Sequence, residues 1–425
     1  MSTSVPRRIR RPVKARTAIS LFSGAGGDTL GMKQAGYHVV AFSEFKKPAI
    51  ETHLAAFPES VHLTNPTTGS PSIIQIPKEV LEPFRDKVDV VFAGFPCQGF
   101  SHAGKKRQED PRNELVYEFA RVVEIVKPRW MIGENVPGLL SRTGRDPITN
   151  QIRPVIEIIE DIFQRIGYHL TYRVWKATDH GVSQERKRLI LIGAPAERGW
   201  PSLPPVSSPP VLAPPVLAPI RPFLETHLRG AVRFPKENHP DNLSPHYWIP
   251  TTEDEAKDNP HPNLVRLVKG IRGLTKKERE DEKGEDTKEK IVPGGLVSFG
   301  VRKSPYHGQI LDPDLPSKTI ICTYGVCPRL FVGLHNSETD TYWVRTLTTT
   351  ELGRIQGFPA DYPWRGKEKE MITQIGNAVP PPLARAVLQS LQTVTFQQEK
   401  EQEKEKDKGR DKEQEQDKDE DEDEE

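Results

Sequence analysis

The stretch that decides the fold runs from Ala18 to Glu44 and reads AISLFSGAGGDTLGMKQAGYHVVAFSE. Its apolar ends, Ala18–Phe22 and Val39–Phe42, have the composition of buried strands, and Asp28–Gln34 between them can form a helix. Glycines at the junction of the first strand and the helix let the backbone approach a ligand closely. The stretch therefore predicts an α/β domain with a doubly wound, Rossmann-like sheet.

The alternation of short apolar runs and helical stretches continues as far as Gly193. Four further runs are expected to be buried parallel strands: Val88–Ala93, Trp130–Ile132, Arg173–Ala177 and Leu189–Ile192. Helical spacing of apolar residues, with glycines or prolines near the ends, predicts helices at Leu115–Val126, Val155–Ile166, Arg345–Pro359 and Met371–Gln392. The segments between the strands have lengths that suit crossover helices.

Shifts in composition predict the domain boundaries. Residues 1–16 resemble a flexible basic arm, 17–195 form the main domain, which 371–392 completes, and 196–370 form a smaller domain. The smaller domain begins with a proline-rich connector, Pro201 to Pro222, and contains a charge-dense insertion around Lys276 to Lys290. Residues 393–425 are a charged, acidic, low-complexity tail for which no fold is expected.

The net charge of +1 for 425 residues hides a strong asymmetry. Residues 399–425 hold 16 Asp/Glu against 7 Lys/Arg, so the rest of the chain is basic and suits a polyanion such as nucleic acid. No apolar run is long enough to cross a membrane, and the first arginines precede no secretory signal. Three cysteines are too few for a disulfide framework, so an intracellular setting is the default, and Cys322 and Cys327 lack the second pair of a zinc site.

An acid follows the glycine turn at a distance typical of nucleoside binding. Glu44 stands twenty residues after Gly24, at the tip of the second strand, where it could accept hydrogen bonds from both hydroxyls of a ribose. Phe45 beside it could stack on the base. The pattern G-x-G-x-x-G is not met because Gly27 follows Gly26 directly, which weakens an NAD interpretation. S-adenosylmethionine fits equally well, and a glycine turn without a ligand is the remaining alternative.

A cysteine stands where a ligand would bind. The strand Val88–Ala93 runs into Gly94-Phe95-Pro96-Cys97-Gln98-Gly99-Phe100-Ser101, and strand ends in open α/β sheets form ligand crevices. Pro96 and the flanking glycines would hold Cys97 in a rigid loop, whereas an unreactive cysteine is usually buried in the core. The nearby cations of Lys105–Arg107 would favour the thiolate. Cys97 is therefore a candidate nucleophile.

Two further blocks bring charge to the same edge of the sheet. Glu134 and Asn135 follow the strand Trp130–Ile132, so a carboxylate and a thiol could act together in covalent acid–base chemistry. Arg186 and Arg188 lie just before the strand Leu189–Ile192 and are expected to point to one face, because side chains two apart share a face of a strand. Alone, each block could equally be a surface acid or a solvated basic turn.

Taken in order, these blocks closely resemble the C5-cytosine methyltransferases that act on DNA. The first part of the set is FSGAGG at Phe22–Gly27, the acid Glu44, GFPCQGFS at Gly94–Ser101, ENV at Glu134–Val136 and QERKR at Gln184–Arg188. The later part is RTLT at Arg345–Thr348, then Glu351, Arg354, QGFP at Gln356–Pro359 and QIGNAVP at Gln374–Pro380.

The resemblance implies a methyltransferase domain that uses S-adenosylmethionine and a separate target-recognition domain. It implies that the catalytic residues are Cys97, Glu134, Arg186 and Arg188. The residues expected to bind the cofactor are Phe22, Gly24, Gly26, Glu44, Phe45, Asn377 and Val379. The residues expected to contact the substrate are Pro96, Gln98, Ser101, Asn135 and Gln184.

The implied reaction begins with attack of the Cys97 thiolate on C6 of a cytosine flipped out of double-stranded DNA. Glu134 would bind or protonate N3, Arg188 with Arg186 would lie near the base carbonyl, and C5 would then accept the methyl group. One departure is that the stretch His62–Ser70 has no acid where the family places one for the adenine amino group. An amide or a backbone carbonyl would replace it, or cofactor affinity would be lower.

Three other functions remain open at this point: a methyltransferase acting on tRNA, a non-catalytic DNA-binding relative and a Rossmann oxidoreductase. The intact Cys97, Glu134 and Arg188 disfavour the second, and the incomplete glycine pattern disfavours the third. We expect a monomer with no membrane contact, located in the nucleus if the source is eukaryotic and otherwise in the cytoplasm. A cognate restriction enzyme is a further possible partner.

Overall fold

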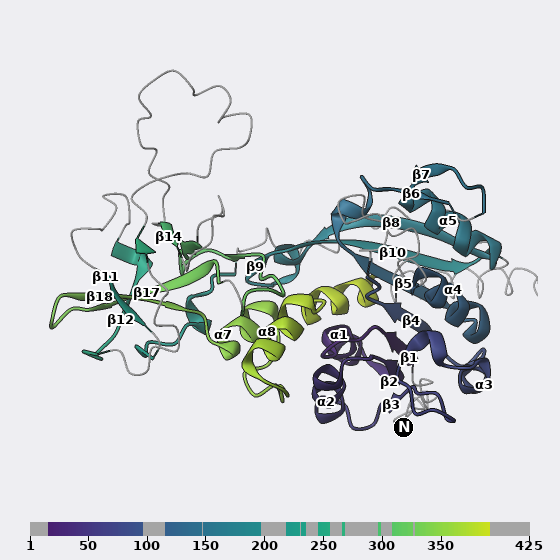
Figure 1. Ribbon diagram of the computed structural model, residues 1–425, viewed down its shortest axis with the longest axis horizontal. Coiled ribbons are helices and arrows are strands. Elements are labelled where there is room, and N and C mark those ends of the chain that lie inside the picture. The colour runs from purple at the N-terminus through teal and green to yellow at the C-terminus, as the bar shows by residue number, and fades with distance from the viewer. Residues whose placement is uncertain are drawn as a thin grey trace, which may run out of the picture.

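The computed structural model describes residues 16–96, 115–146, 148–196, 218–229, 231–234, 245–255, 266–267, 296–298, 308–325 and 328–391. Within these ranges a larger lobe is built on one seven-stranded sheet and a smaller lobe on a second sheet, with the helices α7 (Thr349–Gln356) and α8 (Glu368–Asn377) between them (Figure 1). The acidic tail, the charge-dense run and all of the basic arm but Arg16 lie outside the described residues.

The sheet of the larger lobe has the order β3-β2-β1-β4-β5-β10-β8. Its strands are β1 (Arg16–Leu21), β2 (Tyr37–Ser43), β3 (Val61–His62), β4 (Val90–Ala93), β5 (Trp130–Asn135), β8 (Tyr168–Lys176) and β10 (Lys187–Pro195). The first five pair in parallel, which confirms the predicted doubly wound α/β class. The predicted parallel direction is wrong for β10, which runs antiparallel to both neighbours. The segment between β8 and β10 is too short for a crossover helix.

Helices cover both faces of this sheet. Leu189 and Leu191 of β10 belong to the core shared with α4 (Leu115–Val126) and α5 (Val155–Arg165). Ile190 and Ile192 belong to the core on the other face, shared with α1 (Gly27–Gln34) and a helix over 381–391. This alternation is what a strand buried on both faces requires. The larger lobe also contains α2 (Lys47–Ala56), α3 (Lys78–Leu81) and a hairpin of β6 (Thr143–Arg145) and β7 (Ile152–Pro154).

The smaller lobe is a mixed sheet with the order β11-β18-β17-β15-β14-β13, and β12 pairs with β17. The strands are β11 (Val232–Phe234), β12 (Trp248–Pro250), β13 (Arg266–Leu267), β14 (Leu296–Ser298), β15 (Gly308–Ile310), β17 (Leu330–Asn336) and β18 (Thr341–Thr346). A two-stranded pair of β9 (Gln184–Glu185) and β16 (Ser317–Lys318) joins the lobes. In the described ranges no helix is both long and apolar enough to span a membrane.

Two predicted helices have different bounds in the structure. The one expected from Arg345 begins only at Thr349, because Thr348 caps α7 in a capping box with Glu351, and Arg345 still lies in β18. Its guanidinium forms a fully buried ion pair of 2.8 Å with Glu351, which fixes the helix to the strand.

The helix expected at Met371–Gln392 is two helices. α8 ends at Asn377, residues 378–380 are extended, and the next helix starts at residue 381, since prolines at 380–382 cannot continue α8. Ile372 and Ile375 of α8 pack in the core of the smaller lobe, whereas Leu383 and Val387 pack against the large sheet. The chain therefore returns to the larger lobe at residues 378–380, later than the predicted boundary at 371.

Candidate active site

Several of the predicted site residues lie at one edge of the large sheet. From β1 the chain winds outward through β2 and β3, and then returns to the other side of β1 as β4. At such a reversal of strand order, the carboxyl ends of the strands border a crevice that binds ligands. The glycine turn follows β1, Glu44 follows β2, Gly94 follows β4, and Glu134 is the last residue but one of β5.

The glycine turn has a backbone that only small residues tolerate. Gly24 and Gly26 have φ values of 54° and 85°, in the left-handed region, and Gly26 is the N-cap of α1. Phe22 also has a positive φ of 55°, a strained conformation for a residue with a side chain. A Cβ atom at Gly27 would lie 2.2 Å from the carbonyl oxygen of Val379, so the turn is packed directly against the segment that follows α8.

The Glu44 carboxylate is held by backbone amides at the edge of this turn. Its Oε2 accepts a hydrogen bond of 2.9 Å from the Gly24 amide, and its Oε1 accepts bonds of 2.9 and 2.8 Å from Phe45 and Lys46. A carboxylate can accept about four hydrogen bonds, so with three in use Glu44 can accept about one more, from a hydroxyl of a ligand. The Phe45 ring beside it is 63% exposed, as a side chain that stacks on a base would be.

The amide of Asn65 does not replace the missing acid. Its Oδ1 accepts hydrogen bonds from the amides of Thr67 and Thr68, and its Nδ2 donates to the carbonyl of Gln75. These bonds hold its own loop, so the alternatives that stay open are a backbone carbonyl that contacts the adenine amino group and a lower cofactor affinity.

The loop that leads to Cys97 is fixed to β5. Cys97, Gln98 and Ser101 lie outside the described residues, which end at Pro96. The Asn135 side chain donates a hydrogen bond of 2.9 Å to the carbonyl of Phe95. A Cβ atom at Gly94 would lie 3.8 Å from Oε2 of Glu134, so this carboxylate is beside the start of the loop, three residues before the cysteine.

Glu134 and Arg188 form an ion pair at the base of the crevice. The Arg188 Nε lies 2.6 Å from Oε1 of Glu134, and the two side chains are 12% and 11% exposed. The antiparallel register of β10 on β5, which places Ile190 opposite Glu134, sets the two charges side by side. The second oxygen of Glu134 is the one that faces Gly94.

Arg186 and Gln184 lie elsewhere than expected. Arg186 is buried, and its Nη atoms donate to the carbonyls of Ile320, Gly376 and Ala378 instead of sharing a face with Arg188. Gln184 is fully buried at the junction of the lobes, where its amide bonds Gln356 and the backbone of Ile320. The polar atoms of Gln184 therefore bond protein groups in this structure, and its expected substrate contact stays a prediction.

Sequence reasoning missed a buried acid and a tyrosine behind the glycine turn. Asp28, in the first turn of α1, accepts a hydrogen bond from the Ser20 hydroxyl, and Tyr362 donates to the carbonyl of Ala25. Burial raises the pKa of the Asp28 carboxyl to about 7, and the negative charge of Glu134 contributes to the same shift. Nothing in the sequence distinguished Asp28 from an exposed acid at a helix start.

An Asp28→Asn variant is expected to be more stable than the wild type, and increasingly so as pH rises. Because the folded-state pKa of Asp28, about 7, lies above its ordinary value of 3.8, the wild type loses unfolding free energy between these pH values. The loss is on the order of 4 kcal/mol, and asparagine avoids it. Urea unfolding of both proteins at pH 5, 6, 7 and 8 measures the difference. A difference that stayed constant with pH would contradict the assignment.

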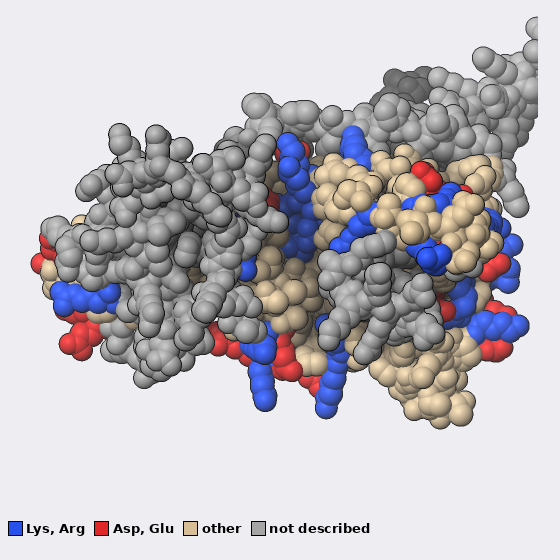
Figure 2. Space-filling view, turned by 45° about the horizontal axis from the view of Figure 1, so that its top comes forward, with Lys and Arg blue, Asp and Glu red and all other residues tan. Residues whose placement is uncertain are grey.

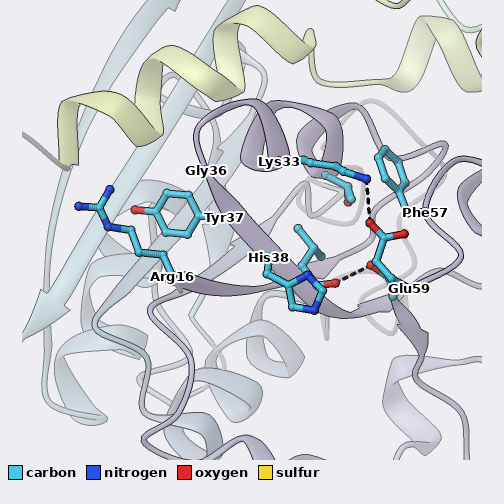
Figure 3. Close-up of a pocket in the computed structure, with 10 residues that line it drawn as sticks. Arg16, Lys33, Gly36, Tyr37, His38, Phe57 and Glu59 are labelled. Carbon is cyan, nitrogen blue, oxygen red and sulfur yellow. Dashed lines mark hydrogen bonds and ion pairs between the residues drawn. The ribbon is translucent and has the colours of Figure 1, made fainter. Parts of the chain in front are cut away.

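Two other polar groupings lie apart from this edge. A cavity of about 200 Å³ lies at the amino ends of β1 and β2, where Arg16 and Tyr37 line it together with the ion pair Lys33–Glu59 (Figure 3).

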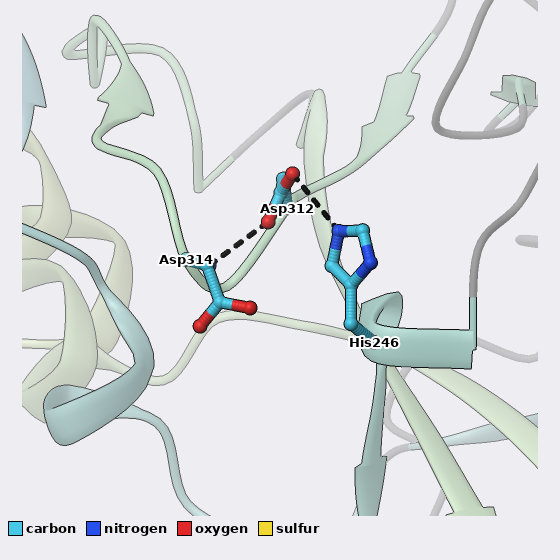
Figure 4. Close-up of side chains that lie close together, drawn as sticks. All are labelled: His246, Asp312 and Asp314. Atoms are coloured by element: carbon cyan, nitrogen blue, oxygen red, sulfur yellow. Dashed lines mark hydrogen bonds and ion pairs between the residues drawn. The ribbon is translucent and has the colours of Figure 1, made fainter.

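In the smaller lobe, His246, Asp312 and Asp314 gather closely (Figure 4). Both oxygens of Asp314 accept hydrogen bonds from Arg221, at 2.6 and 2.8 Å, so one of the two carboxylates of the cluster is already paired with an arginine.

Positive charge borders the crevice. Figure 2 shows lysine and arginine side chains, in blue, gathered in the hollow between the two lobes. A polyanion between the lobes would be attracted there.

Comparison with known proteins finds a family model and relatives that match most of this chain. The family model described as C-5 cytosine-specific DNA methylase matches residues 16–393. The Type II methyltransferase M1.HphI of Haemophilus parahaemolyticus is 31% identical over 379 residues, which cover 88% of this chain and 86% of the relative.

Two solved structures share the fold. A DNA modification methyltransferase encoded within an Escherichia coli prophage has a TM-score of 0.53 at 23% identity, over 90% of this chain and 99% of the other. The Dnmt2 methyltransferase of S. pombe has a TM-score of 0.57 at 15% identity, over 89% and 99% of the two chains.

Proposed function

We propose, since this chain belongs to the C-5 cytosine-specific DNA methylase family, that it methylates C5 of cytosine in duplex DNA through a covalent adduct with Cys97. The observation that carries the proposal is the Glu134–Arg188 ion pair of 2.6 Å, with the second Glu134 oxygen beside the loop that leads to Cys97. An acid and a cation beside the loop that continues to a candidate nucleophile suit covalent acid–base catalysis.

The residues behind β1 and β2 fit S-adenosylmethionine, which supplies the activated methyl group when it is bound. Glu44 would accept a hydrogen bond from a ribose hydroxyl, and Phe45 would stack on the adenine. The amino end of α1, beyond Gly24 and Gly26, would face the carboxylate of the cofactor. Val379 would line the opposite wall, where its carbonyl lies against Gly27. Asn377 is exposed at the end of α8 and would complete that wall.

Each of the side chains at this edge would have a separate role in the reaction. The Cys97 thiolate would attack C6 of the cytosine, which raises the electron density at C5 so that C5 can take the methyl group. A base, for which water is a candidate, would then remove the C5 proton, and the C6–S bond would break to release the Cys97 thiolate and 5-methylcytosine. Glu134 would bind N3 and neutralise the charge that builds up on the ring as sulfur adds. Arg188 would hold the Glu134 carboxylate in place and lie near the base carbonyl. Asn135 would keep the loop in position through its bond to the Phe95 carbonyl, with Pro96, Gln98 and Ser101 around the base.

Duplex DNA would lie in the hollow between the lobes. A cytosine stacked in a duplex is out of reach of a nucleophile, so it must be flipped out, at a cost of a few kcal/mol. Contacts between phosphates and the lysines and arginines of the hollow (Figure 2) would offset this cost. The smaller lobe would read bases in the major groove. Action as a monomer and a cognate restriction enzyme stay predictions.

The proposed function is tested by supplying the purified chain with labelled S-adenosylmethionine and either unmethylated plasmid DNA or tRNA. We expect label in the plasmid alone, and bisulfite sequencing of that plasmid should place 5-methylcytosine within one recurrent short sequence. Label in tRNA with none in plasmid would favour the tRNA alternative. Binding of labelled cofactor without transfer to either substrate would favour a non-catalytic relative.

A further inference from the structure

A buried arginine ties three segments of the chain together. Arg186 is 1% exposed, and its guanidinium donates hydrogen bonds of 3.1 Å to the Ile320 carbonyl, 2.9 Å to the Gly376 carbonyl and 3.0 Å to the Ala378 carbonyl. Ile320 belongs to the core of the smaller lobe, and Gly376 lies in the last turn of α8. Backbone carbonyls alone accept these bonds, so the contact depends on the position of the main chain.

Two glutamines extend this contact. The amide groups of Gln184 and Gln356 are hydrogen bonded to each other, and both side chains are fully buried. Gln184 also accepts a bond of 3.0 Å from the Ile320 amide, and Gln356 donates one of 2.8 Å to the Ala378 carbonyl. The Ala378 carbonyl therefore accepts from Gln356 and from Arg186 at once. We call Gln184, Arg186 and Gln356 the junction cluster.

Arg186 is a buried cation whose hydrogen-bond partners are carbonyl groups and not a carboxylate. Burial, together with the neighbouring charge of Arg188, lowers the pKa of Arg186 to about 9, although the charge of Glu134 acts in the opposite direction. Its bonds at the end of α8 place the cation at the negative end of the helix dipole, which offsets part of the desolvation cost. Burying a cation that bonds only carbonyls costs free energy. Its presence here indicates that holding these carbonyls in place has a use.

The segment that the cluster holds is a wall of the cofactor site. Val379 follows Ala378 directly, its carbonyl lies against Gly27 of the glycine turn, and its Cγ2 would lie 4.0 Å from a Cβ atom at Gly94. The Ala378 amide closes α8 and the Pro380 carbonyl accepts the first bond of the next helix. Between these two helix ends, the Gly376 and Ala378 carbonyls accept bonds from side chains, which therefore help to fix the segment. The position of this wall therefore depends on the hydrogen bonds that Arg186 and Gln356 donate to Ala378, and Arg186 also bonds Ile320 of the smaller lobe.

We propose that Arg186 is a positioning residue which, with Gln184 and Gln356, braces the cofactor wall Gly376–Val379 against the smaller lobe. This inference rests on the proposed function for the identity of the cofactor. It assigns to Arg186 a part in cofactor binding, through the main chain that it holds, and no contact with the base.

The test measures the Kd of S-adenosylhomocysteine by titration calorimetry, and the melting temperature without ligand, on the full chain. Arg186→Met removes the three carbonyl bonds, and Gln356→Met removes the second bond to Ala378. We expect each to raise the Kd by about tenfold or more, while Arg186→Lys, which keeps the charge, has an intermediate effect. If Arg186→Met does not fold, Gln356→Met decides the question.

Tyr324→Phe is the matched control for general loss of stability. Its buried hydroxyl bonds Leu330 and Leu347 inside the smaller lobe and does not touch residues 376–379. We expect a lower melting temperature with less than a twofold change in Kd. Junction variants that bind like the wild type, or a control that weakens binding equally, would overturn the inference. A wild-type chain that binds no S-adenosylhomocysteine would instead refute the cofactor of the proposed function.

Discussion

Methyl transfer by a Cys97→Ala variant is expected to fall by roughly ten-thousandfold or more, to the background of the assay. Without the sulfur there is no covalent adduct at C6, and C5 of the cytosine stays too poor a nucleophile to accept the methyl group. Incorporation of labelled methyl groups into unmethylated plasmid DNA measures the loss. Binding of S-adenosylhomocysteine should be unchanged within a factor of two, because Cys97 is assigned no cofactor contact.

Cys327→Ser is the control for the removal of a thiol as such. Cys327 lies outside every motif of the set, and its replacement should leave the methylation rate within twofold of the wild type. An alanine variant at position 97 that retained a tenth of the wild-type rate would show that the reaction follows another route.

A Glu134→Gln variant is expected to lose about 10²–10⁴-fold in kcat, the usual contribution of a positioned acid. Glutamine has nearly the same shape and can still accept a hydrogen bond from Arg188, but it cannot protonate N3 of the cytosine. The KM for the cofactor should stay within a few-fold, because Glu44 and the glycine turn bind it. Steady-state kinetics with plasmid DNA separate the two parameters.

The outcome that contradicts this role for Glu134 is a loss confined to KM. Such a result would mean that the carboxylate serves only to hold Arg188 and the loop beside Gly94. Asn135→Ala provides the comparison, because it removes the bond to the Phe95 carbonyl without touching the charge. Its kcat should fall less than that of Glu134→Gln.

The main domain could be predicted because its signals are local. Continuous apolar runs, glycines at a strand end and helical spacing are each set by a few neighbouring residues, and α4 has the predicted bounds. The break after α8 also has a local cause, because prolines stand at positions 380–382. It was not predicted because the apolar residues before and after these prolines have the spacing of one continuous helix. The direction of β10 could have been inferred from the short connection that precedes it.

The roles of single polar side chains could not be predicted in the same way. Arg186 and Arg188 belong to one block of the sequence, yet one bonds carbonyls at the lobe junction and the other bonds Glu134. The difference arises because Arg186 lies between β9 and β10, where the chain leaves the junction, and not within a regular strand. Asp28 is buried only because α1 packs against the distant segment around Val379. Such contacts depend on residues far apart in the chain.

The adduct itself is the most direct test. Duplex DNA from plasmids whose cytosines are replaced by 5-fluorocytosine is incubated with the chain and S-adenosylmethionine, and the mixture is denatured. Fluorine at C5 cannot leave as a proton does, so a sulfur–carbon bond formed at C6 should persist. We predict a denaturation-resistant complex whose mass spectrum places the modified nucleotide on the peptide that contains Cys97. A methylating enzyme that forms no such complex, or one attached at another residue, would contradict the account.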